Sequence, residues 1–168
     1  QEILDLGVHA FRLSRWAGPW VGLKIVTSVA DGLGSVDLDA ARHAPADPTG
    51  VVIDGTPWQH QPLATIGPHA VPGQEALVVD HRLEAAKAYA RHNGLDCVVG
   101  AAAGAPLGIV CAGKTYYDVL QAFADLGVHP DDLAAAGVRI LKLAMTYPVV
   151  EDSVLQLAAS VGEILVIE

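Results

Sequence analysis

Positive charge is scarce in this sequence, and so are long apolar runs. Only 10 of the 168 residues are lysine or arginine, against 19 aspartates and glutamates, so the formal net charge is −9 and the pI is near 5.0. A nucleic acid or an anionic membrane surface would repel such a chain at long range, so we expect neither as a partner. No apolar stretch approaches the ~18 residues needed to cross a bilayer, which also argues against a membrane protein.

Cysteine is nearly absent. Cys97 and Cys111 are the only two, too few for a disulfide framework or a metal cluster, so a reducing cytoplasm is the expected setting. Three histidines, His60, His69 and His81, lie in the middle of the chain, but their spacings match no zinc-binding pattern. We therefore expect no metal site.

Catalytic arrangements are missing as well. No serine lies in a G-x-S-x-G turn, Cys111 falls inside an apolar run, and His9 falls on the first helical pattern. These residue types need a base or an orienting group beside them before they can act as nucleophiles or proton carriers. We expect no catalytic and no cofactor-binding residue in this chain.

Apolar residues, in contrast, are abundant. Hydrophobic residues make up 52% of the chain and the mean hydropathy is +0.37, which indicates an ordered, globular protein. The charged fraction of 17% is below the ~25% of an average soluble domain, so part of the surface is expected to lie against other protein. The chain begins at Gln1 and its single methionine is Met145, so we expect a processed product or, as we favour, a cloned segment.

Residues 2 to 31 are predicted to be helical. Apolar residues recur at spacings of three and four up to Ala17, and the pair Gly18-Pro19 should then break or kink the helix. A second helix is predicted from Trp20 to Val29, apolar on nearly every side. Such a helix is normally buried, and a chain this short offers little to bury it. We expect two copies to pair as a homodimer in order to cover it.

The middle of the chain is different. Six of the ten prolines lie between Pro45 and Pro72, which predicts irregular connecting structure with short extended pieces at 50–53 and 76–79. Asp80 is then expected to cap a helix from His81 to Asn93 that stops at Gly94. The small residues of 100–106 read as a linker.

The last third shows the clearest pattern. Apolar strands are predicted at 107–111, 138–143 and 164–167, with helices between them that end at Gly127 and near Val161. Strands that are apolar on both faces and alternate with helices indicate a parallel sheet with right-handed crossovers. The expected fold class is therefore α/β, a parallel three-layer unit preceded by helices and an irregular Pro-rich segment.

Residues 108–115, GIVCAGKT, fit the G-x-x-x-x-G-K-[ST] phosphate-binding pattern letter for letter. That loop must be flexible between its glycines, whereas the four residues here are strand formers preceded by a poor strand. We therefore favour an ordinary strand-to-helix turn in which Thr115, with Asp118, caps the helix.

Ligands of open α/β sheets gather beyond the carboxyl ends of the strands. Two loops follow strands at that edge, and they could line a crevice or, as we favour, an interface between domains. Their candidate residues are Lys114, Thr115, Tyr116, Thr146 and Tyr147.

Six blocks carry a resemblance to a known family: Gln1–Gly7, Leu13–Arg15, Trp20–Lys24, Gly108–Asp118, Leu141–Pro148 and Ile164–Glu168. Taken in order, they resemble the indolepyruvate ferredoxin oxidoreductases in their long fused bacterial form. The resemblance runs from end to end and is weakest between about Arg42 and Val79. It implies that 1–38 is the helical end of a pyrimidine-binding domain, 39–80 an irregular connector and 81–168 a domain like the transketolase C-terminal domain.

The same resemblance implies what the intact enzyme does. It would use thiamine diphosphate with Mg²⁺ to decarboxylate an aryl-pyruvate oxidatively with coenzyme A, passing electrons through 4Fe-4S clusters to ferredoxin. The diphosphate-binding domain, the activating glutamate and the cluster cysteines are not in this sequence, and two cysteines cannot hold a four-iron cluster. We therefore expect a non-catalytic fragment that is inactive alone and packs against other domains of the same polypeptide. The alternatives are a stand-alone α/β binding or scaffold module and, less favoured, a P-loop nucleotide-binding protein.

Overall fold

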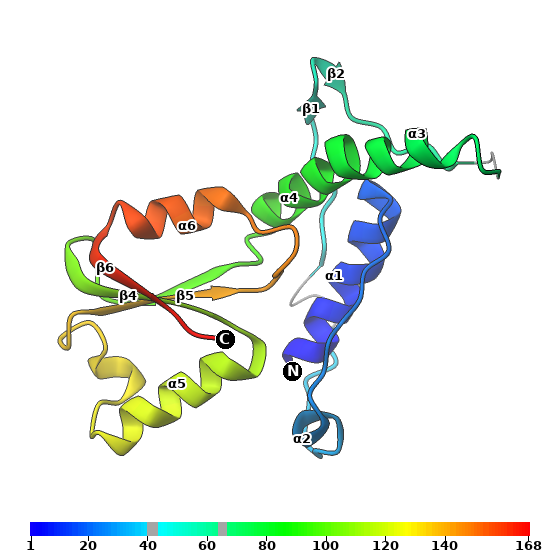
Figure 1. Ribbon diagram of the computed structural model, residues 1–168. Coiled ribbons are helices and arrows are strands. Elements are labelled where there is room, and N and C mark those ends of the chain that lie inside the picture. The colour runs from blue at the N-terminus through cyan, green and yellow to red at the C-terminus, as the bar shows by residue number, and fades with distance from the viewer. Residues whose placement is uncertain (40–43, 64–66) are drawn as a thin grey trace. The chain divides into compact units, whose positions relative to one another are not determined.

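The computed structural model describes residues 1–39, 44–63 and 67–168 (Figure 1). The chain forms two compact units, Gln1–Asn93 and Gly94–Glu168. Parts of the Pro-rich segment, residues 40–43 and 64–66, lie outside the described residues, and the weakest stretch of the resemblance begins there, at Arg42. Within the described ranges, none of the helices is long and apolar enough to cross a membrane.

The first unit is built on two helices that pack together, α1 (Glu2–Ala17) and α4 (Leu83–His92). Their buried residues are four alanines with one leucine and one tyrosine: Leu13, Ala17, Ala85, Ala86, Tyr89 and Ala90. The predicted break after Ala17 is confirmed, because Gly18 adopts a left-handed conformation with φ of 94° and its N–H bonds to the carbonyl of Ser14. A two-stranded hairpin, β1 (Val52–Ile53) and β2 (Thr56–Pro57), lies between these helices in the chain.

Three predictions for this unit are wrong. No helix runs from Trp20 to Val29; only α2 (Thr27–Ala30) forms, because Gly22 and the β-branched Val21, Ile25 and Val26 lower helix propensity in a segment that is exposed. Residues 76–79 are helical rather than extended, since α3 (Val71–Ala76) runs through a π-helical turn (Leu77–Arg82) into α4. Asp80 therefore lies inside a continuous helix and caps nothing.

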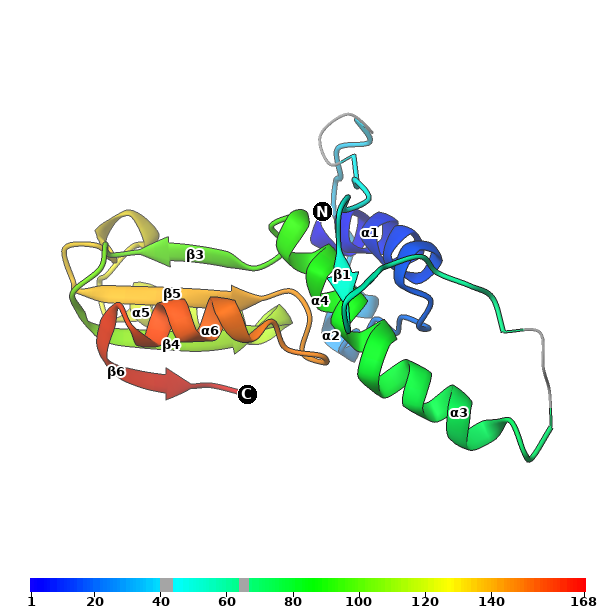
Figure 2. The ribbon, with the colours of Figure 1, turned by 90° about the horizontal axis from the view of Figure 1, so that it is seen from above.

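The second unit is a four-stranded sheet of β3 (Cys97–Gly100), β4 (Ala105–Ala112), β5 (Val138–Leu143) and β6 (Val161–Val166). The strand order is β3-β5-β4-β6, which the view in Figure 2 shows from above. Strands β4, β5 and β6 are parallel, as predicted, and β3 is an antiparallel edge strand beside β5. The α/β fold class is thus confirmed.

Helices cover both faces of this sheet, so it has three layers (Figure 1). Helix α5 (Gly113–Asp125) packs on one face over Ile109, Cys111 and Ile140, close to a 3-10 turn at Pro130–Asp132. Helix α6 (Glu151–Ala158) packs on the other face over Val110 and Leu141. Alternate residues of β4 and β5 point to opposite faces, which is why both strands carry apolar residues on both faces, apart from Arg139 and Lys142 of β5.

Three boundaries in this unit differ from expectation. Residues 97–100 form β3, so the predicted linker is reduced to the turn between β3 and β4. Helix α6 ends at Ala158 and β6 begins at Val161, because Ser160 closes the helix with a hydroxyl-to-carbonyl bond to Leu157 of 2.8 Å. Helix α5 begins at Gly113 without a side-chain cap, so Thr115 and Asp118 do not form the predicted capping pair.

Candidate functional site

The first predicted loop lies where β4 becomes α5. Gly113, with φ of 53°, makes the turn, and the next residues belong to the first turn of the helix. Lys114 is exposed and forms an ion pair with Asp118 one helical turn on, while Thr115 and Tyr116 are half-buried. Lys114 is therefore tied to its own helix.

The second predicted loop follows β5. Thr146 and Tyr147 are both exposed, whereas Pro148 beside them is buried. Because β4 and β5 are parallel neighbours, both loops lie at the same edge of the sheet. No hydrogen bond or ring contact joins Thr146 or Tyr147 to the first loop in the parts of the chain that the structure describes. The structure thus places the five candidates at one edge without bringing them into one cluster.

Lys142, which was not among the residues predicted from the sequence, contacts two tyrosine rings at this edge of the sheet. Its Nζ lies 4.6 Å from the ring centroid of Tyr116 and 4.7 Å from that of Tyr117. The two rings meet edge to face with centroids 5.2 Å apart, and Nζ donates to the Tyr117 hydroxyl at 3.5 Å. The sequence did contain a signal for this contact: a lysine near the end of an apolar strand carries a charge that needs a polar or aromatic partner.

Both cysteines flank Lys142. Cys97 on β3 and Cys111 on β4 are each its register partner, so they are separated by two strand spacings, about 9.5 Å, and remain free thiols. Burial raises the pKa of the Cys111 thiol, an effect that the charge of Lys142 partly offsets, and burial likewise raises the pKa of Tyr116. A buried thiol with a raised pKa is a poor nucleophile.

The donor set does not fit an iron–sulfur cluster. A four-iron cluster takes four cysteine thiolates, and this chain has two, held apart by β5. Among residues 1–39, 44–63 and 67–168, no three histidine, cysteine, aspartate or glutamate side chains come together as metal ligands. Any iron–sulfur cluster of an intact enzyme must therefore be bound by residues outside those that the structure describes.

The phosphate-binding pattern does not form a phosphate-binding loop. Residues 108–112 lie within β4 and are paired with β5, so their backbone groups take part in the sheet instead of turning toward a phosphate. Gly108 itself packs under Val161, whose Cγ2 would lie 2.9 Å from an added Cβ. The preference for an ordinary strand-to-helix turn is thus supported by the backbone geometry.

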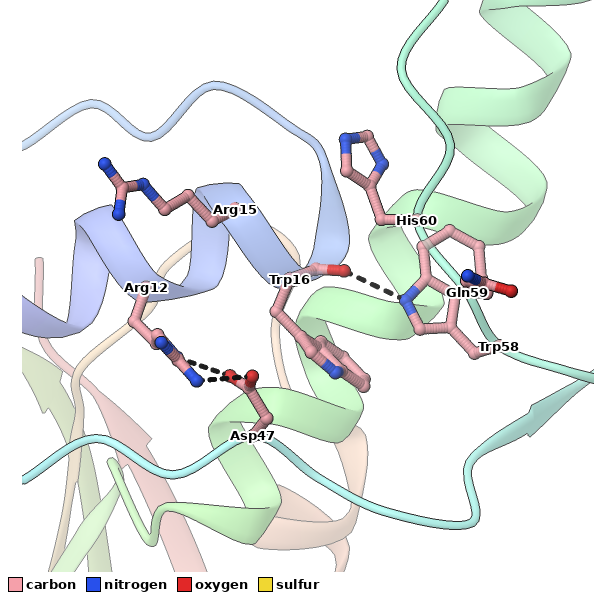
Figure 3. Close-up of a pocket in the computed structure, with 7 residues that line it drawn as sticks. All are labelled: Arg12, Arg15, Trp16, Asp47, Trp58, Gln59 and His60. Atoms are coloured by element: carbon pink, nitrogen blue, oxygen red, sulfur yellow. Dashed lines mark hydrogen bonds and ion pairs between the residues drawn. The ribbon is translucent and has the colours of Figure 1, made fainter.

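The first unit contains a separate pocket of about 250 Å³, shown in Figure 3. It is lined by Arg12, Arg15, Trp16, Asp47, Trp58, Gln59 and His60. Sequence reasoning missed it because its two halves, the end of α1 and residues 47–60, are far apart in the chain and meet only in the fold.

Fold and site together define a mostly parallel α/β domain with a lysine–tyrosine cluster at its strand-end edge. Residues 97–168 of this domain match the family model of the indolepyruvate oxidoreductase domain. The match begins at the first residue of β3 and runs through β6, so it covers the sheet of the second unit. Comparisons with curated proteins and with solved structures give no significant match.

Proposed function

We propose that the second unit is a non-catalytic domain of a thiamine-diphosphate-dependent indolepyruvate:ferredoxin oxidoreductase. Such an enzyme decarboxylates aryl-pyruvates oxidatively with coenzyme A. The observation that carries this proposal is the family match, which coincides with one complete folded sheet. The resemblance of the earlier blocks extends the proposal to residues 1–38, as the helical end of the pyrimidine-binding domain, and to residues 39–80, as the connector that leads to a transketolase C-terminal-like domain of residues 81–168.

The chemistry is assigned to other domains of the same polypeptide. Thiamine diphosphate, Mg²⁺ and the 4Fe-4S clusters would be bound there, and ferredoxin would dock there. Within the described residues of this chain, the cysteines and the strand-end cluster offer no set of groups for these cofactors. The enzyme is expected to work in the cytoplasm, in keeping with its free thiols.

The contribution of this chain is packing. Each unit exposes apolar side chains, among them Trp20 at 99% exposure and Tyr147 and Leu155 in the second unit. A groove of about 760 Å³ lies along α1, with Ile3, Val8 and Phe11 on one side and residues 29–36 on the other. We assign these surfaces, together with the loops of Lys114–Tyr116 and Thr146–Tyr147, to contacts with the catalytic domains.

The chain alone is expected to be inactive. Supplied with indolepyruvate, coenzyme A, thiamine diphosphate and Mg²⁺, it should reduce neither ferredoxin nor a viologen dye above the rate without protein. The product of the complete gene, purified and assayed anaerobically in the same mixture, is the positive control. Turnover by the isolated chain would overturn the assignment, and so would a gene that encodes nothing beyond these residues, which would favour a stand-alone module.

The isolated chain is also expected to form a homodimer, because its exposed apolar surface then lacks the domains that would cover it. Sedimentation velocity should show dimer at high protein concentration and monomer on dilution. Trp20→Ser should shift this equilibrium toward monomer, since a fully exposed indole contributes much apolar area. Leu126→Ser, at a residue that is 78% exposed in the second unit and outside these surfaces, is the matched control and should leave the equilibrium unchanged. A chain that stays monomeric throughout would refute the dimer.

A further inference from the structure

One edge of the sheet in the second unit is formed by β6. It is the last strand in the order β3-β5-β4-β6, and Figure 2 shows it on the side of the sheet away from β3. Its sequence, VGEILV, contains one charged residue, Glu163, and neither lysine nor proline. Leu165 and Val166 are 49% and 63% exposed.

An apolar edge of this kind is unusual in a soluble protein. Edge strands are normally very short, carry lysines or prolines, or are interrupted by bulges, because an unprotected edge pairs with other strands. The opposite edge strand, β3, is only four residues long, whereas β6 has six residues. Among the described residues, no further strand pairs with β6. This edge is therefore suited to pairing with another strand.

The backbone of β6 shows which groups would make that pairing. The N–H of Ile167 donates to the carbonyl of Val110 on β4 at 2.9 Å. Hydrogen-bonding direction alternates along a strand, so Leu165 also faces β4, whereas the N–H and C=O groups of Ile164 and Val166 face away from it. No bond joins these outward groups to another element within the part of the chain that the structure describes. They are available to a strand that docks at this edge.

A second copy of β6 fits the edge when it runs antiparallel. With a two-fold axis at Leu165, Ile164 of each copy faces Val166 of the other, in pairs that exchange backbone hydrogen bonds. The two Leu165 side chains then lie directly opposite each other, in the closer, non-hydrogen-bonded type of pair. Glu163 faces Ile167 of the other copy, so the two carboxylates stay apart, whereas an axis at Glu163 would place them face to face. The centre of this register is entirely apolar.

We propose that two copies of this chain associate through β6, so that their two four-stranded sheets join edge to edge across a two-fold axis. The surface lies in the second unit and does not include Trp20, and the inference stands whether or not the proposed function holds. Because only a few side chains of each copy are buried by such a pairing, the dimer should be weak and should dissociate on dilution.

A charge placed on the axis tests the pairing. Leu165→Glu and Leu165→Lys each put two like charges directly opposite each other, so each variant alone should dimerise about tenfold more weakly or worse. Mixed in equal amounts, the two variants should associate about as tightly as the parent chain, because a glutamate of one then faces a lysine of the other. Sedimentation equilibrium measures these constants. All chains carry Trp20→Ser, which reduces association through the first unit.

The matched controls place the same charges elsewhere on the second unit. Leu126→Glu and Leu126→Lys change a residue that is 78% exposed just after α5, and they should leave the dissociation constant unchanged, alone or mixed. Circular dichroism should show the same fold for all four variants. The proposal is overturned if the parent chain stays monomeric, if the Leu165 mixture associates no better than its components, or if the Leu126 variants behave like the Leu165 variants.

Discussion

Leu141→Ala is expected to lower the free energy of unfolding of the second unit by about 3–4 kcal/mol. Leu141 is 0% exposed and lies at the centre of β5, between β3 and β4. It packs with Val110 and Leu157 under α6, so its truncation leaves a cavity that neighbouring strands cannot close. Native-state hydrogen exchange of the β4 and β5 amides measures the loss, because all three tryptophans lie in the first unit and report on that unit instead.

Leu155→Ala is the matched control. Leu155 lies on α6 but is 63% exposed, so removing the same atoms there should change stability by no more than about 0.5 kcal/mol. If Leu141→Ala lowered the free energy of unfolding as little as Leu155→Ala does, the face of the sheet beneath α6 would not be part of the hydrophobic core. If both were costly, Leu155 would be covered by another chain in solution.

The second unit was predictable where both faces of a strand are buried. Strand β5 was predicted at its observed bounds, because Val138–Leu143 is apolar on both faces apart from Arg139 and Lys142 and is bounded by Gly137. The edge strand β3 was missed. It is short, one-sided and followed by the small residues of 101–104, and only its pairing with β5 makes it a strand.

The first unit shows where pattern reasoning fails. An apolar run such as Trp20–Val26 predicts a helix only if something buries it, and no helix forms there. The π-helical turn at Leu77–Arg82 has no simple periodicity to reveal it, so residues 76–79 read as extended. In both cases the deciding factor was the presence or absence of packing partners, which a local sequence window does not contain.

The candidate sites also differ in how far the sequence could predict them, and for the same reason. Loops at the strand ends could be located from the alternation of strands and helices, since parallel strands bring their carboxyl ends to one edge. Lys142 could not be assigned its role, because its partners Tyr116 and Tyr117 come from another element. The pocket of the first unit depends on the pairing of Arg12 with Asp47, a contact between segments whose association no motif marks.

The largest effect in the first unit is expected from Tyr89→Ala, about 3–5 kcal/mol of unfolding free energy, by analogy with Phe→Ala in protein cores. Tyr89 is 0% exposed, and its ring lies 6.1 Å from those of both Trp16 and His9. Burial raises its pKa to about 12, as expected of a phenol enclosed between α1 and α4. Tryptophan fluorescence during urea unfolding reports the loss, because Trp16 contacts the ring directly.

Two further variants decide what Tyr89 contributes. Phe11→Ala removes an aromatic ring that is 77% exposed on α1, and it should cost no more than about 0.5 kcal/mol. Tyr89→Phe keeps the ring and removes only the hydroxyl, which lies 3.2 Å from His9 Nδ1, so it should cost about 1 kcal/mol. If Tyr89→Phe cost as much as Tyr89→Ala, the bond to His9 rather than ring packing would join α1 to α4. If Tyr89→Ala cost as little as Phe11→Ala, these helices would not share a core.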